Sequence, residues 1–294
     1  MDEPACLHTA ARRYCQARFD EWAGIYADLQ RKEGTHFHSM FQPGWDYSEE
    51  AYRTFPRYRF AKNARIEIER LVVVPTASLS EIEARLIAAS ETAHASLCAE
   101  LKNDLARQAI REEAEDFKAY VGAMTPADLA QVEPLPYRRV LEKEESDRLW
   151  GELKRVWGVG GGYWYPLKEG PVPPDSLAFH TDYFKSINGE RLLREALQRR
   201  GVSRVFLLQE FGDPEYEIEL GIFEPEYKDG GEQYSMSEDV SWMVYASHES
   251  SVTVCGQWLT DSFRKLRPEC AERTYNGPYP TPDLRGTWDT GDKR

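Results

Sequence analysis

The sequence predicts an α+β protein with an N-terminal helical region that contains a long helix, and a C-terminal, mostly antiparallel sheet with flanking helices. Apolar residues recur at helical spacing up to residue 121. Beyond the prolines at positions 126, 134 and 136, short alternating segments separated by turn residues replace that pattern. With 294 residues, of which 41% are apolar, the chain is long enough for two domains with cores of their own.

The first helices follow from apolar spacing and from residues that begin or end helices. Thr9 is placed to cap a helix that Gly34 ends. The apolar stripe of this helix has members three or four residues apart: Cys15, Phe19, Trp22, Tyr26 and Leu29. A short helix is expected to begin at Ser48 and to stop near Pro56, because proline lacks the amide hydrogen. Residues 57–74 are expected to be helical too, although part of this segment alternates like a strand.

The long helix is predicted over residues 79–121, which contain no glycine or proline. Ser78 and Glu81 form a capping box at its start. One face stays apolar, through Ile82, Leu86, Ala89, Ala93, Leu97, Leu101 and Leu105. A continuous helix would be about 65 Å long at 1.5 Å per residue, and such a face needs a partner. Either the helix of residues 9–32 or a second copy of the chain can cover it, so an oligomeric scaffold is one alternative function.

The C-terminal part alternates between predicted strands and helices. Strands are expected at residues 137–141, 163–167, 177–181, 205–211, 216–223, 240–247 and 252–256, the last four forming two hairpins. Helices are expected at residues 145–157, 188–200 and 257–266, and Gly158 and Gly201 end the first two. The sequence therefore predicts a helical domain (1–133), an α+β sheet domain (134–270) and an extended tail (271–294).

Charge and targeting signals narrow the class of protein. Acidic residues outnumber basic ones by 50 to 37, for a formal net charge of −13, which argues against nucleic acid as a partner. The N-terminus is acidic and no apolar signal region follows it, and the longest aliphatic run, residues 71–74, is too short to span a membrane. The five cysteines contain no CxxC motif, which favours a reducing compartment. A cytoplasmic protein without membrane contact is expected.

Carboxylates and aromatic residues are the candidate binding residues. Residues 210–226 contain seven carboxylates and no lysine or arginine. In a strand, Glu215, Glu217 and Glu219 share one face, and three like charges side by side repel each other unless solvent or a cationic partner covers them. The face is therefore either a solvated surface or a docking site for a basic protein. Three aromatic residues after a glycine-rich stretch are predicted to line a cleft and add to the binding surface: Tyr163, Trp164 and Tyr165.

A second set of residues has catalytic chemistry. His180 and Asp182 form an HxD motif at the end of a predicted strand, and His248 lies in a predicted hairpin turn. Together with Glu210 they are candidates for a metal-dependent hydrolase or nuclease, because histidine and carboxylate bind divalent metals and transfer protons. The simpler interpretation is an edge histidine and ordinary turn residues. No complete zinc ligand set, phosphate loop or nucleophile motif is present, so the sequence predicts no resident metal and no cofactor.

Two segments of the C-terminal half resemble a group of bacterial proteins. Residues 241–254 read SWMVYASHESSVTV and are followed by Gly256 and Trp258, and residues 162–167 read GYWYPL. These segments resemble the C-terminal region of uncharacterised bacterial proteins, some of toxin–immunity or defence type. The resemblance implies an immunity-type interaction protein and carries over no catalytic residue. The leading prediction is therefore a non-catalytic, cytoplasmic binding protein for a basic partner such as a toxin.

Overall fold

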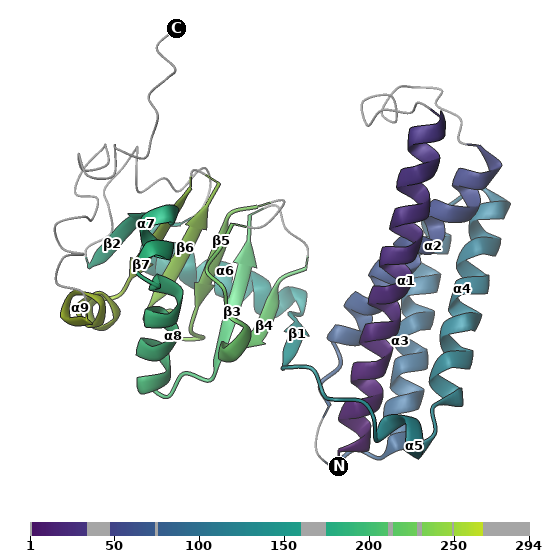
Figure 1. Ribbon diagram of the computed structural model, residues 1–294, viewed down its shortest axis with the longest axis horizontal. Coiled ribbons are helices and arrows are strands. Elements are labelled where there is room, and N and C mark those ends of the chain that lie inside the picture. Colours follow the sequence, from purple (N-terminus) through teal and green to yellow (C-terminus); the bar gives the residue numbers. More distant parts are fainter. Residues whose placement is uncertain are drawn as a thin grey trace, which may run out of the picture. The chain divides into compact units, whose positions relative to one another are not determined.

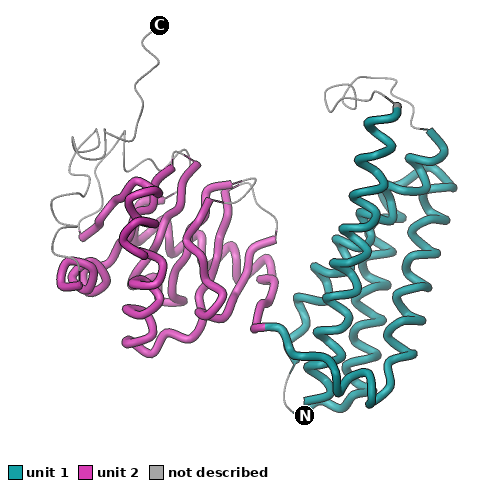
Figure 2. Tube along the Cα trace, viewed as in Figure 1, with its two compact units in different colours: residues 1–135 teal, residues 136–294 magenta. Residues whose placement is uncertain are grey.

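A computed structural model describes residues 2–33, 48–73, 76–159, 175–210, 214–227, 231–248 and 250–266. The chain forms two compact units, residues 1–135 and 136–294, which we call the helical unit and the sheet unit (Figure 2). The described part of the first consists of helices, and the second contains a sheet with helices (Figure 1). The predicted α+β fold class is confirmed.

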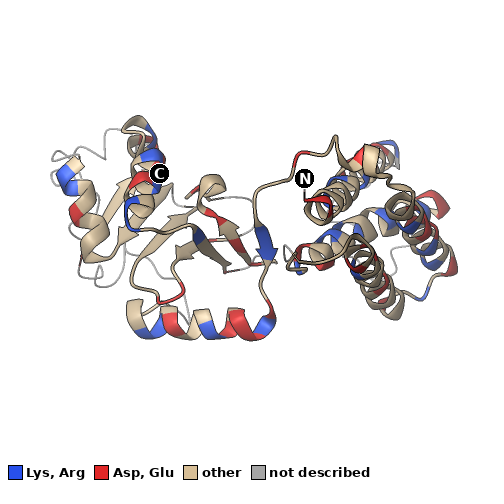
Figure 3. Cartoon of the chain, turned by 90° about the horizontal axis from the view of Figure 1, so that it is seen from below, with Lys and Arg blue, Asp and Glu red and all other residues tan. Residues whose placement is uncertain are grey.

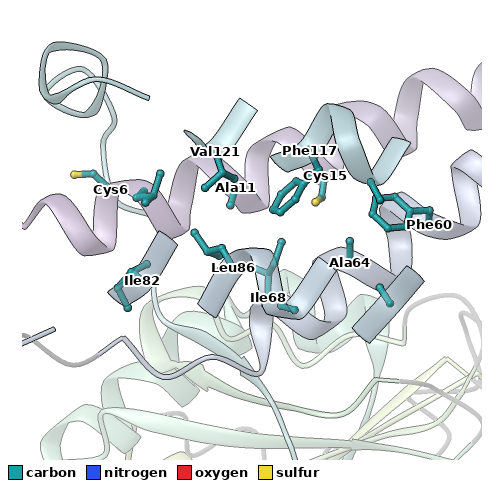
Figure 4. Packing of buried hydrophobic residues seen from close by; sticks show 14 of the residues in the cluster. Cys6, Ala11, Cys15, Phe60, Ala64, Ile68, Ile82, Leu86, Phe117 and Val121 are labelled. Carbon is teal, nitrogen blue, oxygen red and sulfur yellow. The ribbon is translucent and has the colours of Figure 1, made fainter. Parts of the chain in front are cut away.

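Four helices of the helical unit pack around one apolar core. The helices are α1 (Glu3–Glu33), α2 (Glu49–Glu69), α3 (Leu79–Glu100) and α4 (Asp104–Ala123), followed by the short α5 (Pro126–Leu129). Each of the four contributes fully buried side chains to the core, among them Cys6, Ala11, Phe60, Ile68, Leu86 and Phe117 (Figure 4). No helix in the described ranges combines the length and the apolar character needed to cross a membrane.

The prediction of one continuous helix over residues 79–121 is wrong. Helix α3 ends at Glu100, Leu101 is extended (φ −91°, ψ 135°), and the Asn103 side chain caps α4 by accepting a 3.1 Å hydrogen bond from the Ala106 amide. The two helices then pack against each other, so their apolar faces lie in the same core. This packing covers the face that needed a partner, so the alternative of a homo-oligomer through residues 79–121 loses its physical argument.

Two helix boundaries also differ from expectation. Helix α1 begins before Thr9, at Glu3, and the Asp2 side chain accepts a 3.1 Å hydrogen bond from the Ala5 amide. Thr9 lies inside the helix, where its Oγ1 accepts from the Leu135 amide at 3.1 Å. Ser48 caps α2 as predicted, but the helix continues through Pro56. Proline removes a single backbone hydrogen bond there, and burial of the helix in the bundle outweighs that loss.

The sheet unit contains a seven-stranded antiparallel sheet. In chain order its elements are β1 (Arg138–Val140), α6 (Lys143–Trp157), β2 (Ser176–His180), α7 (Thr181–Ser186), α8 (Gly189–Arg199), β3 (Arg204–Gln209), β4 (Tyr216–Glu219), β5 (Gln233–Met236), β6 (Met243–Ser247), β7 (Ser251–Cys255) and α9 (Gln257–Leu266). The strands lie in the order β1-β4-β3-β5-β6-β7-β2, and each neighbouring pair is antiparallel. A 3-10 turn, Leu220–Ile222, follows β4.

Helices cover both faces of this sheet (Figure 1). On one face, α6 packs Leu149 and Leu153 against side chains such as Leu208 and Met236. On the other face, α7, α8 and α9 pack against the sheet and each other, with Phe179 of β2 touching a phenylalanine from α7 and one from α9. The sheet is therefore the middle layer of three, and residues that alternate along a strand enter different cores.

The sheet unit follows the sequence prediction closely. The two hairpins, β3–β4 and β6–β7, are confirmed, as are α6, α8 and α9. Two strands of the hairpins are shorter than predicted, because β4 ends at Glu219 instead of residue 223 and β6 begins at Met243 instead of residue 240. Gly158 ends α6 in the left-handed conformation (φ 70°). Strand β5 was not predicted, and the strand expected over residues 163–167 lies outside the described residues.

Gly256, directly after β7, is expected to tolerate no side chain. Its φ is 110°, and a Cβ atom would lie 3.0 Å from the Ser241 carbonyl oxygen. Gly256→Ala should therefore lower the free energy of unfolding of the sheet unit by about 2 kcal/mol, from strain and steric overlap together. Gly201→Ala is the control, because its φ is 76° but nothing lies within 4 Å, so it should cost about 1 kcal/mol. Urea unfolding of both variants tests this, and equal losses would contradict the steric argument.

Candidate functional site

Polar side chains form a row across one end of the sheet. The backbone pairing places five polar residues side by side: Glu210 directly after β3, Glu232 directly before β5, Ser247 on β6, Ser251 on β7 and His180 on β2. Side chains two residues apart along a strand point to the same face of the sheet. Each of the five lies two residues from a side chain that faces α6, so all five belong to the face that α6 covers. That inner row is Leu208, Tyr234, Tyr245, Thr253 and Ala178. The core under α6 thus changes from apolar to polar toward this end.

Part of this end is a connected set of acidic and aromatic residues. We call it the acidic–aromatic cluster, consisting of Trp150, Glu210, Glu215, Glu232, Tyr234, Tyr245 and His248. Trp150 of α6 donates from Nε1 to Glu215 Oε1 at 2.7 Å, and its ring lies edge-on to Tyr234 at 5.4 Å between centroids. The Tyr234 hydroxyl donates to Glu210 Oε1 at 3.0 Å, and the Tyr234 and Tyr245 rings are 4.8 Å apart. The cluster therefore links α6 to three strands.

Glu232 and His248 form the second half of the cluster. Glu232 is only 3% exposed and accepts hydrogen bonds from the His248 backbone amide, at 3.3 Å, and from the Ser247 hydroxyl, at 3.4 Å. Its Oε1 also contacts His248 Nδ1. A carboxylate on Nδ1 orients the imidazole ring and selects its tautomer. The His248 side chain is 45% exposed, so a buried acid holds a histidine that reaches the surface.

The cluster is rich in negative charge. No lysine or arginine in the described ranges forms an ion pair with Glu210, Glu215 or Glu232. Burial raises the pKa of Glu210, the hydrogen bond from Tyr234 opposes this, and the charge of Glu232 adds to the rise. Burial also raises the pKa of Tyr234 and of Tyr245, so both hydroxyls stay protonated at neutral pH. The charge of His248 opposes the rise in the pKa of Glu210, and His248 is the only basic side chain among the described residues that contacts Glu232.

The expectation that Glu215, Glu217 and Glu219 form an open acidic face is corrected by the structure. Glu217 is 9% exposed and accepts from Tyr137 Oη at 2.7 Å, from Arg139 Nη2 at 3.0 Å and from Arg204 Nη1 at 3.2 Å. Glu215 belongs to the acidic–aromatic cluster, while Glu219 is exposed and accepts from the Tyr137 amide at 3.2 Å. The like charges are tolerated because β1 and β3 bring arginines to Glu217.

The four candidate catalytic residues do not meet at one point. His180 and Asp182 stay together, with His180 Nδ1 accepting from the Asp182 amide at 3.2 Å and lying 3.8 Å from its carboxylate. Glu210 and His248 are both in the acidic–aromatic cluster, joined through Glu232. His180 lies four strands away from Glu210, about 19 Å at roughly 4.8 Å per strand. Among the described residues, no group of three or more potential ligands is placed to hold a metal ion.

Glu232 and Tyr234 could not be chosen from the sequence, because β5 itself was not predicted. Tyr245 lies in a predicted strand, but its neighbours in the cluster depend on strand pairing that the sequence does not show. The predicted aromatic binding residues Tyr163, Trp164 and Tyr165 lie outside the described residues. The chain matches no family model, no curated protein and no solved structure. The resemblance to toxin–immunity proteins therefore stays a prediction, and the geometry of the acidic–aromatic cluster has to support any function by itself.

Proposed function

We propose that the chain is a non-catalytic binding protein whose acidic–aromatic cluster receives a lysine or arginine side chain from a basic partner protein. One observation carries the proposal: three carboxylates gather beside two tyrosines and a tryptophan, without a lysine or arginine counterion from the described residues. A partner of toxin type, as the sequence resemblance suggests, would supply that counterion.

The arrangement suits a cation for two reasons. The buried members, Glu232, Tyr234 and Tyr245, are held by hydrogen bonds and ring packing, so little side-chain freedom is lost on binding. Glu210 is half-buried and His248 half-exposed, so these two residues form the accessible side. A guanidinium can bond to a carboxylate and lie against an aromatic ring at the same time, which makes arginine the better occupant.

Calorimetric titration with a hexa-arginine peptide tests this proposal. Glu210→Gln should weaken binding about tenfold, because one charge-assisted hydrogen bond is lost, and it should reduce the dependence on salt. Glu144→Gln removes the same charge from the outer side of α6, where acidic and basic residues alternate, and should leave the affinity within about twofold (Figure 3). Equal affinities of the two variants would show that the peptide responds only to the net charge, and would contradict the proposal.

A further inference from the structure

We propose that a second site, at the other end of β3, binds a small phosphorylated ligand that carries hydroxyl groups. A groove of about 850 Å³ runs between α8 and the segments that begin β3 and follow β4. Its charged and aromatic lining consists of Tyr137, Arg191, Arg194, Glu195, Arg204 and Glu219. The volume is in the range of small-molecule sites. The groove thus gathers three arginines in a chain whose net charge is −13.

The three arginines have donor groups to spare. Arg191 contacts Glu195 through Nη1 at 3.1 Å, and Arg204 contacts Glu217 through Nη1 at 3.2 Å. Arg194 uses Nη1 for two contacts, one with the Phe223 carbonyl at 3.0 Å and one with the Glu190 carboxylate. Among the described residues, Nε and Nη2 of these three side chains have no acceptor. The existing contacts with a carbonyl or a carboxylate oxygen therefore leave two donors on each arginine. Two donors of one guanidinium can bond to two oxygens of the same phosphate group.

Arg204 is also held in position. Its guanidinium lies 3.8 Å from the centre of the Tyr137 ring. The hydrogen bond from its Nη1 to the buried Glu217 holds the same guanidinium in place. A positioned guanidinium loses less side-chain freedom on binding than a mobile one does. The Arg204 side chain is nevertheless 51% exposed, and that of Arg191 61% exposed, so both reach a ligand from solvent.

The acidic residues in the groove limit what it can bind. Glu195 and Glu219 would repel a long polyanion such as nucleic acid, whereas each can accept a hydrogen bond from a ligand hydroxyl. A sugar phosphate combines one dianionic group with several hydroxyls. This site is independent of the proposed cation site, because Arg204 begins β3 and Glu210 follows its end.

Calorimetry and amide NMR with ribose 5-phosphate test the inference on the full chain, with ribose as the uncharged control. We expect binding of the phosphate and not of ribose, with shifts of the Gly201 and Gly221 amides that line the groove. Arg191→Gln should weaken binding about tenfold. Arg199→Gln is a matched control, because Arg199 also pairs with Glu195 and is also 61% exposed but does not line the groove.

Three results would overturn this assignment. They are absence of binding at millimolar ribose 5-phosphate, equal binding of ribose, and equal weakening by Arg191→Gln and Arg199→Gln. The last would mean that the phosphate senses only the charge of α8. The two proposals are tested by separate titrations. A failed ribose 5-phosphate titration would not affect the proposed cation site, and a failed hexa-arginine titration would not affect the proposed phosphate groove.

Discussion

Glu113→Gln is expected to lower the free energy of unfolding of the helical unit by about 3–5 kcal/mol, because it removes the shared partner of two arginines from a buried position. Glu113 is 1% exposed and accepts from Arg18 at 2.5 and 2.8 Å, from Trp22 Nε1 at 3.0 Å and from Arg57 at 3.3 Å. Both guanidinium groups also lie over the Trp22 ring, at 4.9 and 5.0 Å from its centre. Glutamine keeps the shape of the side chain but removes the buried carboxylate that both arginines share, so that only the more exposed Glu21 remains with Arg18 and Glu112 with Arg57.

Hydrogen exchange of residues 104–123 in increasing urea measures this loss in the helical unit alone. Glu112→Gln is the control, because Glu112 is the neighbouring residue and also pairs with Arg57, but its side chain is 45% exposed. An exposed pair of this kind contributes about 1 kcal/mol or less. If both substitutions have the same small effect, the buried network around Glu113 does not stabilise the bundle.

Glu217→Gln should cost the sheet unit about 2–4 kcal/mol, since three donors lose a buried carboxylate. Glu219→Gln on the same strand should cost less than about 1 kcal/mol, because that side chain is exposed. Urea unfolding of the two variants, followed by exchange of the β3 and β4 amides, gives the comparison. Equal losses would show that the contacts with Tyr137, Arg139 and Arg204 contribute little.

The same contacts predict how stability depends on pH. Burial by itself would raise the pKa of Glu217, but hydrogen bonds from Tyr137, Arg139 and Arg204 outweigh it and place the pKa below its ordinary value of 4.5. The folded form therefore holds the proton less tightly than the unfolded chain does. The stabilisation is present above pH 4.5 and is lost as the pH falls through the lowered pKa. The sheet unit should thus weaken in acid, and Glu217→Gln should show a smaller pH dependence.

Local signals explain how much of the fold the sequence predicts. The end of α6 at Gly158 and the two hairpins depend on residues next to each other in the chain, and all were predicted. The break between α3 and α4 was missed because a side-chain cap, Asn103, makes it without glycine or proline. Helix α2 continues past Pro56 because packing in the bundle outweighs one missing hydrogen bond.

The site was harder to predict because it depends on pairing between distant strands. The residue types of Glu210 and His248 singled them out, but Glu232, which joins them, belongs to the segment that leads into the unpredicted β5. Strand β5 is only four residues long, so its alternation of polar residues (Gln233 and Ser235) with apolar ones (Tyr234 and Met236) is a short signal in the sequence. The arginine neighbours of Glu217 come from β1 and β3, and only the strand order shows that they meet.

The most direct test of the central claim, that the acidic–aromatic cluster binds a cation, is an NMR titration of the full chain with hexa-arginine. The indole N–H of Trp150 reports on the cluster because it donates to Glu215 next to Tyr234. Our account predicts that this signal and the amides of Glu232 and His248 shift together and saturate at one dissociation constant. Shifts confined to exposed acidic residues such as Glu144, with the Trp150 indole unchanged, would contradict it.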